Sequence, residues 1–329
     1  MTKKVSILLT SFVFIFLVGG LITGFTSSAV AQTDDEVTIG YAARNLTNPY
    51  WIAAKNGIED AAEEFGYDVV SLDASGDQNN QQTQVEDLIQ KDVDALLITS
   101  IVTGSSASGE AADAAVKAGI PVIGVDTSAG SPRVAATIRT DQELGGKLAG
   151  ERVLELIDGS GEVVVLEGPA GDTNSMLRVG GFEKVIAENP DVEIVASTPA
   201  DWNRSKGMTA MQDIMVGNPN IDAVWAANDE MALGAVQALM GAGRLDQVYV
   251  GGFDATPDAL DSISNENMSF SVKQFPYKEG YKGVEIAHKI LNGETFETAL
   301  KMRPWPWGTE HYIAMRPTIV DVENVEEYK

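Results

Sequence analysis

The stretch Trp225–Leu239, WAANDEMALGAVQAL, contains the pattern that decides the fold. A short apolar run ends at Asn228 and Asp229, and an alanine-rich helical pattern begins directly after these two polar residues. Continuous apolar runs of this kind are typical of strands buried on both faces of a parallel sheet. The stretch therefore predicts a strand followed at once by a helix, with an amide and a carboxylate at the junction.

The same alternation of apolar runs and helical patterns continues on both sides of this stretch. It starts at Val37, and a second array of the same plan starts near Asp141. Apolar strands that alternate with helices indicate an α/β fold with parallel sheets. The chain is therefore expected to contain two βαβ arrays in series. The expected strands are 37–43, 67–74, 95–100, 120–127, 161–168, 192–198, 223–229 and 247–254.

The C-terminal tail is too short to form a domain of its own. It contains one strand at 268–274, one helix at 277–293 and one final strand at 310–317. The total of 329 residues is the length of about two domains rather than three. We therefore expect the tail to cross back and complete each of two lobes in turn.

The predicted lobes are joined by three crossings, which we expect near Thr140, near Gln274 and before Glu310. The N-terminal lobe then contains 35–139 plus 275–308, and the C-terminal lobe contains 140–274 plus 309–329.

Residues 1–31 have the features of a secretory signal peptide. Lys3 and Lys4 precede a long uncharged apolar stretch, and Ala29-Val30-Ala31 has the small-x-small form of a cleavage site. An uncleaved membrane anchor is the alternative, because the apolar stretch is long enough to span a bilayer. The small-residue site and the polar QTDDE after it favour cleavage, and thus export to the periplasm.

Composition excludes several classes of function. The chain contains no cysteine, which excludes thiol catalysis and cysteine-ligated metal. Its formal net charge of −25 would repel nucleic acid and anionic membranes. A large exported core needs no disulfide for stability, so the absence of cysteine is compatible with export.

Polar and aromatic residues follow the carboxyl ends of the predicted strands. Ligands of α/β proteins bind at this edge of a parallel sheet. Taken singly, such residues are ordinary helix caps or core aromatics. Together they supply carboxylates, amides, a guanidinium and aromatic rings at one rim, which two facing lobes would enclose. The candidates are Arg44, Asn48, Tyr50, Trp51, Asp126, Arg178, Trp202, Asn228, Asp254 and Gln274.

This set of side chains suits a sugar. Carboxylates and amides pair with hydroxyl groups in fixed directions, and arginine supplies a planar fork of donors. The C–H faces of a sugar ring pack against indole and phenol rings. At the opening stretch, Asn228 is expected to point at the ligand and Asp229 to cap the helix that follows.

Several motifs resemble those of the ribose-type periplasmic sugar-binding proteins, from Val37 to about Asn292. They are NPYW, VDT, RVGGF, ADWNRSKG, NDEMALGA, VGGFDATPD and VKQFP. The resemblance implies an α/β type I periplasmic binding protein with two Rossmann-like lobes joined by three hinge crossovers. It implies a monomer that closes on a monosaccharide or polyol and delivers it to the permease of an ABC importer, without a cofactor or a metal.

The resemblance also assigns the site, residue by residue, with one departure. It implies that Asn48, Tyr50, Trp51 and Asp126 contact the ligand from the N-terminal lobe. The ribose binders have an arginine directly after the aspartate, where this chain has Thr127. We therefore add Thr127 to the site and predict that D-ribose is not the best ligand. The implied contacts of the second lobe and the hinge are Arg178, Trp202, Asn228, Asp254 and Gln274.

Arg44 stands at the end of the first strand, where the family pattern has a small residue. Its guanidinium is expected to replace the missing one from another direction, and so to read a different pattern of hydroxyl groups.

Parts of the same pattern also occur in three other classes of protein. Paired carboxylates hydrolyse glycosides, but His288 and His311 lie off the rim and no nucleophile motif is present. A sugar-sensing repressor needs a DNA-binding module before Val37, where a hydrophobic segment stands instead. A sensor that presents its ligand to a chemoreceptor or a sensor kinase uses the same cleft and stays open as an alternative.

Overall fold

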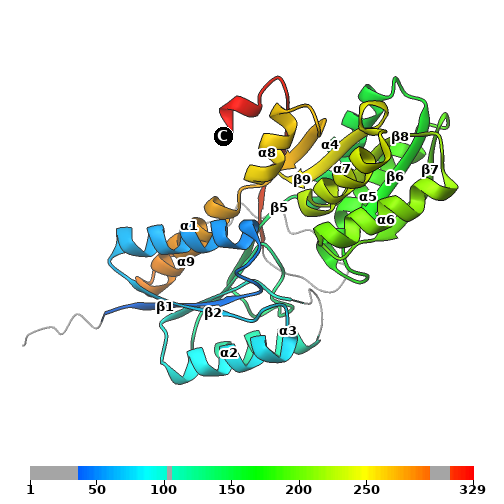
Figure 1. Cartoon of the computed structure of the whole chain (residues 1–329). Helices are drawn as coiled ribbons and strands as arrows, with labels where there is room; N and C mark the ends of the chain where they lie inside the picture. Colours follow the sequence, from blue (N-terminus) through cyan, green and yellow to red (C-terminus); the bar gives the residue numbers. More distant parts are fainter. Residues whose placement is uncertain (1–35, 102–105, 297–311) are drawn as a thin grey trace, which may run out of the picture. The chain divides into compact units, whose positions relative to one another are not determined.

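The structure, a computed structural model, describes residues 36–101, 106–296 and 312–329. Within these residues the chain forms two six-stranded sheets flanked by helices (Figure 1). The predicted α/β fold with two mostly parallel sheets is confirmed.

The first sheet has the strand order β11-β5-β4-β3-β1-β2, and every pairing in it is parallel. Its central strands are apolar and fully buried, as expected for strands covered on both faces. The strands are β1 (Thr38–Ala43), β2 (Asp68–Asp73), β3 (Ala95–Ile98), β4 (Val122–Val125), β5 (Ala136–Thr140) and β11 (Tyr312–Met315).

The second sheet has the order β12-β10-β9-β8-β6-β7. Its strands are parallel except for the edge pair of β10 and β12, which is antiparallel. The strands are β6 (Gly161–Glu167), β7 (Val192–Pro199), β8 (Ile221–Ala226), β9 (Tyr249–Asp254), β10 (Phe270–Lys273) and β12 (Thr318–Asp321).

Helices cover both faces of each sheet. On the first sheet α1 packs against α9 on one face, and α2 packs against α3 on the other (Figure 1). On the second sheet α4 packs against α5, and α6 packs against α7. The helices are α1 (Pro49–Phe65), α2 (Gln78–Gln90), α3 (Ser106–Lys117), α4 (Gln142–Leu156), α5 (Thr173–Ala187), α6 (Arg204–Gly217), α7 (Asp229–Ala242), α8 (Pro257–Ser264) and α9 (Pro276–Leu291), with short 3-10 turns η1 (Leu245–Gln247) and η2 (Val325–Glu327).

The third crossing between the sheets differs from the prediction. The chain passes to the second sheet after β5 and returns between β10 and α9. The predicted boundary before Glu310 assigned 309–329 to the second lobe, but β11 pairs with β5 in the first sheet. Only β12 joins the second sheet, beside β10. The chain therefore passes from the first sheet to the second for the last time between Met315 and Thr318. This crossing lies at the end of the segment 310–317, which was predicted as a single strand.

Strand β5 was not expected from the sequence. Its residues ATIRT are all buried, although Arg139 and two threonines interrupt the apolar run. Arg139 lies 5.9 Å from the ring centroid of Tyr312 on the neighbouring strand β11. Burial of a cation in a strand needs such partners from elsewhere in the chain, and a local pattern does not show them.

Each sheet has its own apolar core. In the second sheet the Phe182 ring of α5 stacks on the Trp225 ring of β8, with centroids 4.5 Å apart. In the first sheet Ile39 and Ile123 pack under α1 and α9, and Leu96 packs under α2 and α3. These cores hold the carboxyl ends of the strands in fixed positions, and polar residues lie in the loops that begin there.

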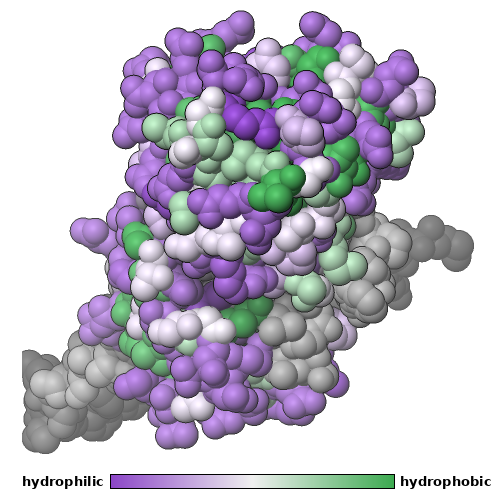
Figure 2. Space-filling view, turned by 45° about the vertical axis from the view of Figure 1, so that its right-hand side comes forward, coloured by the Kyte–Doolittle hydropathy of each residue, from purple (hydrophilic) through white to green (hydrophobic). Residues whose placement is uncertain are grey.

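Hydrophilic residues cover most of the face shown in Figure 2, and hydrophobic ones lie scattered among them. In the described parts of the chain, no helix combines the length and the apolar character needed to cross a bilayer. The predicted signal peptide 1–31 and the part of the first lobe at 297–308 lie outside the described residues.

Candidate ligand-binding site

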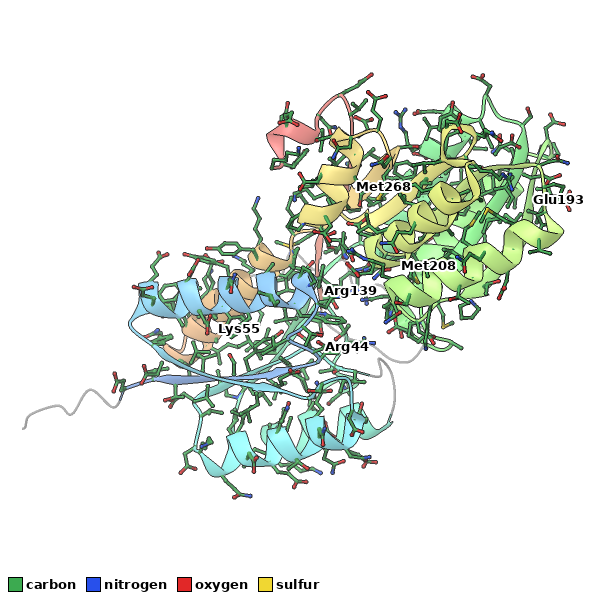
Figure 3. The ribbon with its side chains drawn as sticks, viewed as in Figure 1. Arg44, Lys55, Arg139, Glu193, Met208 and Met268 are labelled. Atoms are coloured by element: carbon green, nitrogen blue, oxygen red, sulfur yellow. The ribbon has the colours of Figure 1, made fainter. Side chains whose placement is uncertain are left out.

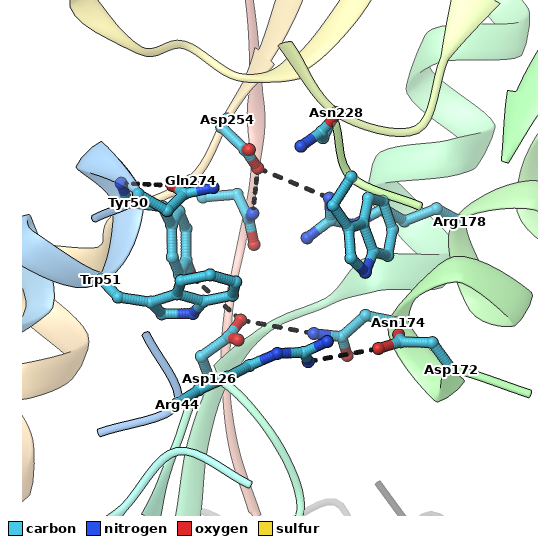
Figure 4. Close-up of a pocket in the computed structure, with 12 residues that line it drawn as sticks. Arg44, Tyr50, Trp51, Asp126, Asp172, Asn174, Arg178, Asn228, Asp254 and Gln274 are labelled. Carbon is cyan, nitrogen blue, oxygen red and sulfur yellow. Dashed lines mark hydrogen bonds and ion pairs between the residues drawn. The ribbon is translucent and has the colours of Figure 1, made fainter. Parts of the chain in front are cut away.

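A pocket lies where the carboxyl ends of strands from both sheets meet (Figure 4). It contains about 360 Å³ of space not filled by protein atoms, part of it open to solvent. Ten of the eleven predicted site residues line it, and Thr127 does not. The lining residues are Arg44, Asn48, Tyr50, Trp51, Asp126, Asp172, Asn174, Arg178, Trp202, Asn228, Asp254 and Gln274.

The backbone is strained at three of these residues. Asp126, Trp202 and Asp254 have φ values of 63°, 59° and 119°. Positive φ is uncommon for residues other than glycine, and such residues gather at functional sites. With this backbone conformation the three side chains point into the pocket. The packed cores of the two sheets maintain the strained conformation.

Asp126 is the centre of one end of the pocket. It directly follows β4 and is only 3% exposed. Its Oδ1 accepts a hydrogen bond from the Tyr50 hydroxyl at 3.0 Å and faces Asn174 Nδ2 at 3.4 Å. Burial raises the pKa of Asp126, and the guanidinium of Arg178 acts in the opposite direction. A carboxylate has acceptor sites on both oxygens, so these contacts leave room for a hydroxyl group of a ligand.

Asp254 is the centre of the opposite end. Its Oδ1 accepts from Gln274 Nε2 at 2.6 Å and from an Arg178 amino group at 3.4 Å. Burial raises the pKa of Asp254 well above its usual range, and Arg178 opposes this rise. Asp254 and Gln274 come from the ends of the adjacent strands β9 and β10, which explains their contact.

Arg178 on α5 is fixed by its own set of partners. Its Nε donates to Gln142 Oε1, and an amino group donates to the carbonyl oxygen of Ala227, both at 2.7 Å. The guanidinium lies 3.9 Å from the ring centroid of Phe253 and 5.3 Å from that of Trp202. Its donors therefore hold a set direction before any ligand arrives, which lowers the cost of binding.

Arg44 supplies a second guanidinium, from the loop after β1. It forms an ion pair with Asp172 at 3.2 Å, and its Cζ lies 5.2 Å from the Trp51 ring centroid. Asp172 caps α5 of the second sheet, so this ion pair joins residues that belong with different sheets. In Figure 3 Arg44 lies at the ends of the first-sheet strands, whereas Glu193, on the edge strand β7 of the second sheet, lies far from it.

Two polar atoms of the pocket residues are buried without a protein partner. Among the described residues, neither Trp51 Nε1 nor Asn174 Oδ1 has a hydrogen bond. Buried polar groups are rarely left unpaired, because each unpaired group lowers stability by about 1–3 kcal/mol. One is a donor and the other an acceptor, so together they match a partner that both donates and accepts.

The predicted roles of Asn228 and Asp229 need correction. Asn228 lines the pocket and is also the N-cap of α7, because its Oδ1 accepts from the backbone N–H of Met231 at 2.9 Å. Asp229 does not cap the helix. It is fully buried and accepts from Thr256 N at 2.7 Å and from Ser271 Oγ at 2.6 Å. The extended backbone of Asn228 places its side chain at the N-terminus of α7. Asp229 already belongs to the first turn of the helix and therefore is not the N-cap.

Thr127 does not reach the pocket. It is fully buried, and its hydroxyl donates to the backbone oxygen of Ser100 at the end of the neighbouring strand. The prediction that Thr127 belongs to the site is therefore wrong. Arg44 is the other departure from the family pattern, and it does line the pocket.

Comparison with known proteins places the chain in a family. A family model described as periplasmic binding protein domain matches residues 39–295. The chain belongs to the periplasmic binding protein family. The ribose import binding protein of Salmonella typhimurium is 37% identical over 278 residues, which cover 84% of this chain and 92% of that protein.

Two solved structures are similar to this periplasmic binding protein, each with a TM-score of 0.80 and 30% identity. One is an ABC transporter solute binding protein from Bacillus halodurans with bound myo-inositol, with coverage of 89% of this chain and 97% of that one. The other is an ABC transporter periplasmic solute binding protein from Actinobacillus succinogenes with bound D-allose, with coverage of 89% and 100%. The resemblance stated from the motifs is confirmed.

Sequence reasoning missed two lining residues of this periplasmic binding protein. Asp172 and Asn174 follow β6 in the segment GPAGDTNS. The rule that found the other candidates, polar residues after the carboxyl end of a strand, applies equally to this segment. Asp172 also has a structural role, because its Oδ1 accepts from the backbone N–H of Ser175 and so caps α5.

Proposed function

We propose that this protein binds a monosaccharide or a related polyol or cyclitol in the pocket and delivers it to an ABC importer. The observation that carries the proposal is the pair of buried, unpaired atoms Trp51 Nε1 and Asn174 Oδ1 in a pocket lined by three carboxylates and two guanidiniums. A hydroxyl group is both donor and acceptor, so a ring with several hydroxyl groups satisfies such a mixed set.

The relatives support this class of ligand. Their names and structures concern ribose, myo-inositol and D-allose, each a small compound with several hydroxyl groups. The two guanidiniums of Arg44 and Arg178 stand at different sides of the pocket, each tied to an aspartate. We retain the prediction that D-ribose is not the best ligand, because Arg44 offers donors from the end of the first strand.

The delivery step needs a change of conformation. We propose that the helices and strands around each sheet act as one lobe, and that the segments at Thr140–Gln142, Lys273–Pro276 and Met315–Thr318 act as hinges. Ligand contacts from Asp126 on one side and Asp254 on the other would favour the closed state. Export through the predicted signal peptide, a monomeric state and presentation of the ligand to a chemoreceptor stay predictions.

A thermal-shift screen of the mature chain tests the proposal. Pentoses, hexoses, sugar alcohols and cyclitols are each added in excess, and the melting temperature is measured. A ligand at 100 times its dissociation constant adds about 2.7 kcal/mol to the free energy of unfolding, which raises the melting temperature by several degrees. Calorimetry then ranks the hits. A flat screen across all four classes contradicts the proposed ligand class, and ribose in first place contradicts the prediction on ribose.

A further inference from the structure

Glu279 on α9 is a fully buried carboxyl group directly behind the pocket. It does not line the pocket. Both of its carboxyl oxygens have hydrogen-bond partners within the protein. Its Oε1 accepts from the Thr140 hydroxyl at 2.7 Å, and its Oε2 lies 3.1 Å from the Tyr50 hydroxyl oxygen. The Tyr50 oxygen also lies 3.0 Å from Asp126 Oδ1. A single tyrosine hydroxyl therefore stands between two carboxyl groups.

The number of protons decides how these contacts are satisfied. A tyrosine hydroxyl has one proton to donate, and an ionised carboxylate has none. If both carboxyl groups were ionised, one of them would face the tyrosine oxygen without a proton between them. A buried contact between two oxygen atoms that have no proton between them is strongly unfavourable. One additional proton on either carboxyl group gives every contact in the chain a donor and an acceptor.

The surrounding charges place this proton on Glu279 rather than on Asp126. Asp126 lies at the pocket, where both Arg178 and Arg44 favour its ionised form. Glu279 lies farther from the pocket, and Arg139 is the cation whose field acts on it. A proton on Glu279 Oε2 would donate to the Tyr50 oxygen, and the Tyr50 proton would donate to Asp126.

We propose that Glu279 is a positioning residue that holds a proton at neutral pH and, through Tyr50, fixes the Asp126 carboxylate in the orientation that binds a ligand hydroxyl group. The proposal deepens the proposed function and rests on it for the ligand. The relay joins three segments, since Tyr50 comes from α1, Glu279 from α9 and Asp126 from the loop after β4. Thr140 at the end of β5 adds a fourth segment. Its hydroxyl donates to Glu279 Oε1, so that Oε2 is the oxygen that faces Tyr50.

The electrostatics around Glu279 agree with the geometry. The titratable and charged groups that face it are Tyr50 from α1, Tyr41 from β1, Asp126 after β4 and Arg139 from β5. Burial, with Asp126 as the second cause, raises the pKa of Glu279 to about 8. Above this value Glu279 ionises and competes with Asp126 for the Tyr50 proton. Affinity for the ligand is therefore expected to fall as the pH rises through this range.

The first test needs no ligand. Infrared spectra of the wild type and of Glu279→Gln are compared near neutral pH, in the carbonyl region of protonated carboxylic acids. The wild-type spectrum should contain a band that the variant lacks. Glu285→Gln, on the same helix but half-exposed and paired with Lys282, is the matched control and should keep the band. Identical spectra for the wild type and Glu279→Gln would overturn the proposal.

The second test measures binding of D-ribose and of myo-inositol by calorimetry, at about pH 6 and about pH 9, on either side of the raised pKa. The wild type should lose about tenfold in affinity at the higher pH, which corresponds to one hydrogen bond to a charged group. Glu279→Gln keeps a neutral donor at this place and should show a ratio near one. Glu279→Leu has no donor and should bind about tenfold more weakly at both pH values.

Two results would contradict the positioning role. One is a pH-dependent loss in Glu279→Gln equal to that of the wild type, and the other is wild-type affinity in Glu279→Leu. If neither compound binds the wild type, the failure concerns the proposed ligand class, and the infrared comparison still decides where the proton lies.

Discussion

Asp126 and Asp254 mark the two ends of the pocket, and each is held by neighbours that leave part of its acceptor capacity for a ligand. We expect Asp126→Ala and Asp254→Ala each to lower sugar affinity by about a hundredfold or more. Hydrogen bonds to charged groups contribute about 1.5–3 kcal/mol each, and each variant loses two acceptor oxygens. Calorimetry gives the affinity, and circular dichroism verifies the fold. Near-native affinity in a folded variant would show that the aspartate serves the structure alone.

Trp51 and Trp202 both line the pocket, and each has a guanidinium beside its ring. Gly168 makes room for the Trp202 ring, because a Cβ atom at Gly168 would lie only 2.2 Å from it. We predict that the two indoles pack against opposite faces of the ligand ring. Tryptophan fluorescence should then change when a ligand from the screen is added. The change should shrink in both Trp51→Phe and Trp202→Phe, and an unaltered response in either variant would remove that ring from the site.

At the scale of elements, the helix pairs meet through glycines. In α4 and α5, a Cβ atom on Gly146 would lie 1.9 Å from the Arg178 backbone oxygen, and one on Gly181 would lie 2.2 Å from that of Glu143. Gly207 and Gly234 have the same relation in α6 and α7. These glycines allow the backbones to approach closely, and the packing of α5 on α4 in turn positions Arg178.

This packing predicts opposite effects for two adjacent glycines of α5. Gly181→Ala should lower the free energy of unfolding by about 1–3 kcal/mol, because the added methyl group collides with the backbone of α4. Gly180 has no atom within 4 Å of an added Cβ, so Gly180→Ala should be neutral or stabilising by up to about 1 kcal/mol. Urea denaturation of both variants measures the difference, and equal stabilities would show that the helices separate without strain.

At the scale of the whole molecule, contacts from the loops of both sheets to one ligand predict closure. Saturating ligand should lower the radius of gyration measured by small-angle X-ray scattering, because the closed state is the one in which Asp126 and Asp254 both bind it. Asp254→Ala is the control and should respond less at the same concentration. A radius that stays constant in the wild type, under conditions where calorimetry shows saturation, would argue against hinged lobes.

The buried acids also make the stability of the molecule depend on pH. Burial raises the pKa of Asp229 to about 7 and that of Glu279 to about 8, from ordinary values of 3.8 and 4.5. Between the ordinary and the raised values the folded state binds more protons than the unfolded chain, so the free energy of unfolding falls as the pH rises.

We expect the melting temperature to decline from about pH 5 to about pH 8, the window between the ordinary and raised pKa values. Glu279→Gln removes one of the buried acids whose pKa is raised and should make the decline less steep, whereas Glu285→Gln should leave it as in the wild type. A variant profile parallel to that of the wild type would show that Glu279 does not titrate in this range.

The sequence by itself determined the α/β class and most of the pocket. Continuous apolar strands such as β3 and β4 indicate burial on both faces, because a strand that is covered on both faces has apolar side chains on both. Polar residues after strand ends, such as Asp126 and Asp254, are predicted because parallel strands present their carboxyl ends at one edge. Both inferences use a local pattern whose geometric consequence is fixed.

Only the tertiary structure decided the partners of the charged and polar side chains. Arg44 meets Asp172 at a separation of 128 residues, and Tyr50 meets Glu279 at a separation of 229. The buried strand β5, with Arg139 in it, and the division of the tail between β11 and β12 depend in the same way on neighbours from elsewhere in the chain. A buried charge is tolerated only where a partner neutralises it, and folding alone brings such distant partners together.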